Sequence, residues 1–225
     1  MRIAQPIMLT DEERDILTRW SRGRSTPTRL VLRAKIVLLA ASGEAWACAC
    51  CTNPGQRYVD VETLDSGRLE EIERLRFGKE ARLYVGGAGV EAITGIQDPA
   101  ERYDLSVNWD KTHPGKTNLS FTLDNPGGRS GTLSLRLPKA ISVFEVDPRD
   151  SPDQGTGPVL YKEWKLTGEV TGTGAFSGTN SAKQVLTLIL QGRGNSCTSA
   201  ADFTHWTLVT EGPKGSYSLF GELVR

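Results

Sequence analysis

The sequence predicts a mainly β protein: an antiparallel β-sandwich or barrel preceded by an N-terminal helical pair. Three observations carry this prediction. After residue 78, apolar and polar residues alternate with period two in short runs. Gly, Pro, Asn or Asp separates these runs, as in chains of hairpin-linked strands. Residues 9–44 follow the spacing of helices instead.

The composition is that of an ordinary globular chain. The 225 residues are 38% hydrophobic and 24% charged, and 27 basic side chains balance 27 acidic ones. Residues 1–44 hold eight Lys or Arg against five Asp or Glu, so the remainder has the acidic surplus. We therefore expect no nucleic-acid binding by the β-rich part. We also expect no transmembrane segment, because no apolar run approaches the ~18 residues that a membrane helix needs.

Helix signals mark the N-terminal segment twice. Thr10 is a suitable N-cap, and Glu13 stands three residues later, as in a capping box. Gly23 ends this first helix. A second helix is predicted to begin with Pro27 at its first position and to stop at Gly43.

The segment LTDEERDILTRWSRGRSTPTRLVLRAKIVLLAASGE (residues 9–44) resembles a known family. Its LT-x-EER and LRA-x-IVLLAA-x-G motifs are similar to the homeodomain-like N-terminus of mariner-like bacterial insertion-sequence transposases. In that family a recognition helix follows and enters the DNA major groove. Here the similarity ends at Glu44, before such a helix. The resemblance implies a helix-turn-helix fragment, either kept as a fusion relic or active in a cytoplasmic DNA-binding, transposase-related protein.

A secretory signal is a second interpretation of overlapping residues. Arg33 and Lys35 precede the apolar run Ile36 to Ala41, and Ala45-Trp46-Ala47 then matches an A-x-A cleavage site before Cys48. We therefore divide the chain into the helical pair of residues 1–44 and an exported β-rich domain of residues 48–225. The protein is predicted to be periplasmic or secreted if this signal functions, and cytoplasmic otherwise.

The four cysteines are Cys48, Cys50, Cys51 and Cys197. The first three are too close together for the C-x-x-C spacing of a structural zinc site. In an oxidising compartment we expect one of them to form a disulfide with Cys197. In a reducing compartment Cys48, Cys50 and Cys51 would instead be a thiol cluster able to bind a soft metal such as Cu(I). A separate alternative function is an extracytoplasmic metal binder that uses the same three cysteines.

One helix and nine strands are predicted after the cysteines. The helix lies within residues 64–78, with Ser66 as its cap. The nine strands are residues 81–87, 102–109, 117–125, 131–138, 140–147, 159–170, 184–192, 203–210 and 217–224.

Two links between these strands have the residues of tight turns. DNPGG (residues 124–128) and EGPKGS (residues 211–216) contain the Pro and Gly that such turns require, so we predict two hairpins. The alternation around the first hairpin predicts a set of core residues. These are Leu119, Phe121, Leu123, Leu133, Leu135 and Leu137.

Candidate catalytic motifs each lack a required part. Gly115-Lys116-Thr117 ends like a phosphate-binding loop, but Asp110 stands where that loop has Gly, and a strand rather than a helix follows. The two histidines, His113 and His205, have no nucleophile-elbow serine near them. We therefore predict no catalytic residue, no cofactor, and a non-enzymatic domain whose role and partner the sequence does not indicate.

Overall fold

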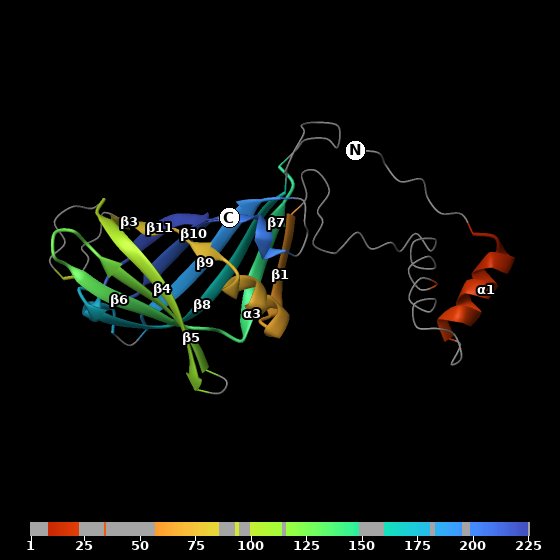
Figure 1. Ribbon diagram of the computed structural model, residues 1–225, viewed down its shortest axis with the longest axis horizontal. Helices are drawn as coiled ribbons and strands as arrows, with labels where there is room; N and C mark the ends of the chain where they lie inside the picture. Colours follow the sequence, from red (N-terminus) through yellow and green to blue (C-terminus); the bar gives the residue numbers. More distant parts are fainter. Residues whose placement is uncertain are drawn as a thin grey trace. The chain divides into compact units, whose positions relative to one another are not determined.

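A computed structural model describes most of the β-rich part and one N-terminal helix (Figure 1). The described residues are 9–22, 34, 57–85, 93–94, 100–113, 116–148, 160–180, 183–194 and 199–224, with the backbone alone at 21–22, 111–113 and 116. The chain divides into two compact units, Met1–Ala49 and Cys50–Arg225. Each unit is described by itself.

The first unit contains the helix α1, Asp11–Arg22. Its start is the predicted capping box: the Glu13 N–H donates to Thr10 Oγ1 at 3.2 Å, and the Thr10 N–H donates to Glu13 Oε2 at 2.9 Å. Of the second predicted helix, only Ala34 belongs to the described residues, and it is helical and buried.

The second unit is built on eleven strands and a short helix, α3 (Ser66–Glu73). The strands are β1 (Arg57–Thr63), β2 (Arg76–Phe77), β3 (Glu80–Val85), β4 (Arg102–His113), β5 (Lys116–Asp124), β6 (Ser130–Arg136), β7 (Ala140–Val146), β8 (Tyr161–Gly174), β9 (Val185–Arg193), β10 (Phe203–Glu211) and β11 (Tyr217–Val224). The 3₁₀ turns η1 (Ser177–Thr179) and η2 (Ala200–Asp202) complete the described elements.

Eight of these strands close into an antiparallel barrel. Their order is β8-β6-β5-β4-β3-β11-β10-β9, and the pairing of β9 with β8 completes the ring. The predicted mainly β fold is thus confirmed, and it takes the barrel form. The nine predicted strands correspond to β3 through β11, whereas β1 and β2 were not predicted.

Both predicted hairpins are present. The turn after β5 places Phe121 opposite Leu133, and the turn after β10 places Thr207 opposite Phe220. Five of the six predicted core residues are fully buried, and Leu137 is half-buried.

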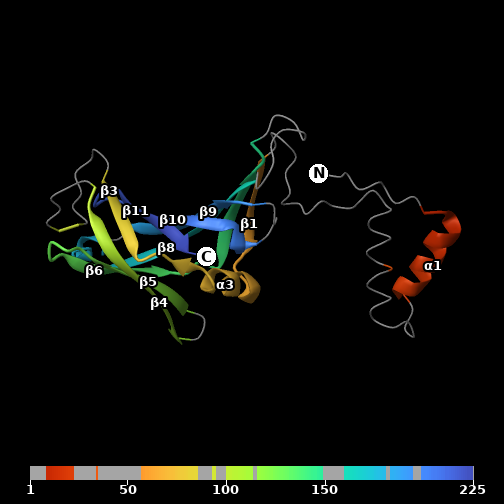
Figure 2. The ribbon, with the colours of Figure 1, turned by 45° about the horizontal axis from the view of Figure 1, so that its top comes forward.

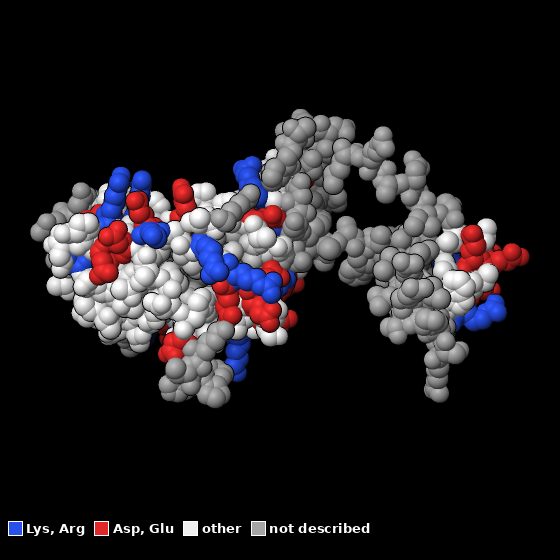
Figure 3. All heavy atoms as spheres, viewed as in Figure 1, with Lys and Arg blue, Asp and Glu red and all other residues white. Residues whose placement is uncertain are grey.

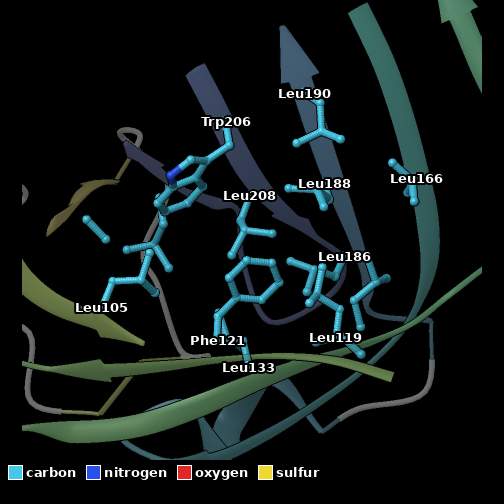
Figure 4. Close-up of a cluster of buried hydrophobic side chains, with 14 of the residues drawn as sticks. Leu105, Leu119, Phe121, Leu133, Leu166, Leu186, Leu188, Leu190, Trp206 and Leu208 are labelled. Carbon is cyan, nitrogen blue, oxygen red and sulfur yellow. The ribbon is translucent and has the colours of Figure 1, made fainter. Parts of the chain in front are cut away.

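The barrel interior is packed with apolar side chains, which Figure 4 shows pointing inward from the surrounding strands. Aromatic rings also meet there: Phe121 lies 5.7 Å from Phe77 and 6.1 Å from Trp206 between ring centroids. An eight-stranded barrel is just wide enough for its side chains to fill it. Binding sites are therefore to be sought at its ends and in its wall.

The strands β7 and β1 form a two-stranded ribbon that extends from β8 of the barrel. One edge of β8 pairs with β7 over Tyr161–Lys165 and with β6 over Val170–Gly174, while its other edge pairs with β9. The strand β1 pairs with the other edge of β7 and is the second strand of this ribbon. In Figures 1 and 2, α3 lies beside β1 and β8.

The start of α3 corrects one prediction. Asp65, not Ser66, is the N-cap, because its carboxylate accepts the Arg68 N–H at 2.9 Å and its backbone is extended. Ser66 is the first helical residue. Ile72, on the inner side of the helix, is fully buried in the barrel core.

Candidate functional site

Side-chain contacts fasten α3 to one end of the barrel. Arg68 forms an ion pair with Glu62 on β1, and its guanidinium carbon lies 4.6 Å from the ring centroid of Trp164 on β8. Glu71 accepts the backbone N–H of Ala200 at 2.8 Å. Charged side chains of both signs gather over this helix in Figure 3. The end that α3 covers is therefore held by charged contacts as well as by apolar packing.

The barrel wall opens next to α3, between β2 and β4. The strand β4 pairs with β3 only over Arg102–Asp104, and the Leu105 N–H then donates to the carbonyl of Lys79 at 2.7 Å. The strand β2 pairs with Leu223 and Val224 of β11 instead. After Leu105, no strand among the described residues pairs with this edge of β4.

Gly78 makes the step from β2 to β3 possible. Its N–H donates to the carbonyl of Glu222 at 2.8 Å, so the two backbones are in direct contact. A Cβ at this position would lie 3.0 Å from the same carbonyl oxygen. The absence of a side chain at Gly78 thus allows the chain after β2 to stay against β11.

A pocket of about 240 Å³ lies in this opening, which we call the slot. Most of its lining residues have apolar side chains, but polar atoms form more than half of the surface exposed in it, and Glu73 and Arg76 are its charged residues. The slot is lined by Glu73, Leu75, Arg76, Phe77, Gly78, Leu105, Val107 and Trp109.

Backbone polar groups also face the slot. Successive residues of a strand present their N–H and C=O groups to alternate edges. Because the Leu105 N–H points toward β2 and β3, the groups of Val107 and Trp109 point the same way. Among the described residues no strand pairs with them there. The slot therefore combines apolar side chains with a mostly polar exposed surface, which includes backbone hydrogen-bond donors and acceptors that a ligand could use.

A second pocket, of about 280 Å³, lies on the other side of Leu75 and Arg76. We call it the arginine pocket. It is lined by Glu71, Arg74, Leu75, Arg76, Ser199, Ala200, Ala201, Phe203, Leu223 and Val224.

Buried charges lie beneath α3. Lys162 is 1% exposed and forms an ion pair with Asp202 at 2.5 Å. Glu145 is opposite Lys162 in the ladder of β7 and β8, and neither of its carboxylate oxygens has a hydrogen-bond partner within the described part of the chain. Burial raises the pKa of Glu145 to about 7, although the positive charge of Lys162 lowers it. This carboxyl is therefore poised to titrate near neutrality.

The described residues bring none of the sequence-predicted sites together. The disulfide candidates Cys48, Cys50, Cys51 and Cys197, which include the alternative metal ligands, lie outside them, so both predictions stand untested. Within residues 57–224 as far as they are described, no cluster of three His, Cys, Asp or Glu could hold a metal ion.

The two histidines lie on separate strands. His205 is exposed on β10 between its cross-strand neighbours Gln191 and Glu222, and His113 is the last residue of β4. The Thr204 hydroxyl lies 2.9 Å from His205 Nδ1. The sequence Gly115-Lys116-Thr117 was not predicted to bind a nucleotide, and its Lys116 and Thr117 belong to β5, the strand expected there from the apolar alternation.

Comparison with known proteins gives no family. No family model matches the chain, and no curated protein or solved structure matches it either. The resemblance of residues 9–44 to transposases therefore stays a prediction from their motifs. Among the described helices, none has the length and apolar character needed to cross a membrane.

Proposed function

We propose that the β-rich domain of residues 48–225 is a non-enzymatic binding domain that takes a small, partly apolar molecule in the slot. The observation that carries this proposal is the opening of the barrel wall between β2 and β4. Concave sites that place polar groups beside apolar and aromatic side chains are the usual form of small-molecule sites.

The chemistry of the slot indicates its ligand class. Phe77 and Trp109 offer aromatic walls, and the backbone of Val107 and Trp109 offers donors and acceptors along one side. A cavity of ~150 Å³ holds benzene, so 240 Å³ suits a molecule of two fused rings.

Isothermal titration calorimetry of the full chain with 2-naphthol tests the proposal. This probe has two fused rings and one hydroxyl, and we expect saturable 1:1 binding at submillimolar concentration. Val107→Phe fills the slot and should abolish binding. Phe220→Ala, on the outer face of β11 where Phe220 is 41% exposed, is the matched control and should bind as the wild type does. Absence of saturable binding by the wild type would refute the proposal.

The location that we propose for this domain is extracytoplasmic. The support is the order of Arg33 and Lys35, the apolar run and Ala45-Trp46-Ala47 before Cys48. Intact mass and N-terminal sequencing of the protein from cells test it. A mature N-terminus at Cys48, with a mass lower by two hydrogens for a disulfide to Cys197, is expected. A chain that retains residues 1–47 in cells would contradict export.

A further inference from the structure

The floor of the arginine pocket is apolar and buried. Ala200 is 1% exposed, Phe203 2% and Leu223 8%, and all three line the pocket. They come from η2, from the start of β10 and from the end of β11, which pairs with β10, and Ala200 also donates its N–H to Glu71 of α3. An apolar group that enters the pocket from solvent would therefore lose its contact with water against this floor.

The rim of the same pocket carries two guanidinium groups and one carboxylate. Arg74 pairs with Glu70 at 3.4 Å, but both side chains are largely exposed, so this pair is weak. The Glu71 carboxylate accepts the Ala200 N–H. The backbone of Arg76 pairs with Val224 of β11, whereas its guanidinium has no hydrogen bond or ion pair with any residue that the structure describes.

The net charge of the rim favours a ligand with a negative charge. The lining of the arginine pocket holds Arg74, Arg76 and Glu71, a net positive charge, whereas the slot holds only Arg76 and Glu73. A guanidinium group can donate two parallel hydrogen bonds to one carboxylate. An apolar floor beneath a cationic rim thus matches a molecule with an apolar chain and a terminal carboxylate.

We propose that the arginine pocket binds a short-chain carboxylate, with its chain on Phe203 and Leu223 and its carboxylate at Arg76. This site is separate from the slot and goes beyond the function proposed above. Its volume of about 280 Å³ is nearly twice the ~150 Å³ that holds benzene. An unbranched chain of about eight carbons therefore fits.

Titration calorimetry of the full chain with octanoate and with 1-octanol tests this assignment. The two probes share chain length and differ in charge. We expect octanoate to bind about tenfold more tightly than 1-octanol, because a charge-assisted hydrogen bond contributes more than a neutral one. Arg76→Gln should remove that preference. Arg82→Gln, which changes an exposed arginine on the outer face of β3, is the matched control and should keep it.

A second variant locates the site. Ala201→Phe adds a ring to the lining of the arginine pocket and should abolish the binding of both probes, while 2-naphthol binding in the slot persists. Equal affinity for octanoate and 1-octanol in the wild type would overturn the assignment, as would a preference that survives in Arg76→Gln. Neither of these two results bears on the slot proposal. If the protein fails to bind 2-naphthol but still prefers octanoate, only the slot proposal is refuted.

Discussion

Arg68 lies with its guanidinium carbon 4.6 Å from the ring centroid of Trp164, and the same group pairs with Glu62. The two contacts join α3 to β8 and to β1. Both partners are shielded, since the side chains of Arg68 and Glu62 are 15% and 25% exposed. A helix of eight residues would be marginal on its own, so these contacts help to hold α3 over the barrel end.

Arg68→Ala should destabilise the protein. It removes the stacked cation and leaves Glu62 with no guanidinium beside it, which together should cost about 2 kcal/mol in the free energy of unfolding. Urea unfolding, followed by tryptophan fluorescence, measures the change. Arg74→Ala is the matched control: its pair with Glu70 is exposed, so the change should stay within about 0.5 kcal/mol. Equal effects of the two variants would contradict this account.

Glu145→Gln should change how stability depends on pH. Burial raises the pKa of Glu145 from 4.5 to about 7 in the folded protein. The folded state thus holds this proton more tightly than the unfolded state, and the resulting stability is lost as pH rises from about 4.5 to about 7. The variant lacks this titration. Its unfolding free energy relative to the wild type should therefore rise by about 3 kcal/mol across that interval.

The surroundings of Glu145 define the control. The charged groups that act on it are Lys162 on β8, Glu62 on β1, Arg68 on α3 and Asp202 in η2. Urea unfolding at several pH values from 4.5 to 8 provides the comparison. Glu169→Gln, in which an 80%-exposed side chain is changed, should follow the wild type. Parallel pH curves for Glu145→Gln and the wild type would show that the carboxyl is not held protonated.

Gly168→Ala should disturb the branch point of the barrel. On β8, Gly168 lies between the ladder with β7 and the ladder with β6, and an added Cβ would lie 2.2 Å from the carbonyl oxygen of Arg136. We expect a loss of about 2–3 kcal/mol in unfolding free energy. Gly67→Ala in α3 meets nothing nearer than Asp65 Oδ1 at 3.5 Å and should stabilise by about 0.5–1 kcal/mol. Thermal unfolding of both variants checks the signs, and a neutral Gly168→Ala would be evidence against the close contact.

Most of the barrel could be predicted because its strands bury one face and expose the other. Phe121 and Leu133 alternate with hydroxyl residues, so period two was visible in the sequence. The strand β1 reverses this pattern. Its Val59 and Val61 are 65% and 69% exposed, while the polar Glu62 faces inward to Arg68. A reversed alternation gives no signal for a buried apolar face, and the strand was missed.

The two pockets could not be predicted, because they depend on where pairing stops. The strand β2 has two residues, Arg76 and Phe77, too few to show any period. The strand β4 extends beyond its pairing with β3. This follows from the long-range register of the sheet and not from the residues of β4 itself. Gly78 was the one local signal, since a glycine after an apolar residue indicates close approach of another backbone.

The most direct test of the binding proposal is a ¹⁵N–¹H correlation spectrum of the full chain titrated with 2-naphthol. We predict that the amide signals of Gly78 and Val107 and the indole signal of Trp109 shift progressively and saturate. The amide signal of the exposed residue Phe220 should stay in place. Shifts confined to residues outside the slot, or no shifts at millimolar probe, would contradict the central claim that the opening between β2 and β4 is a binding site.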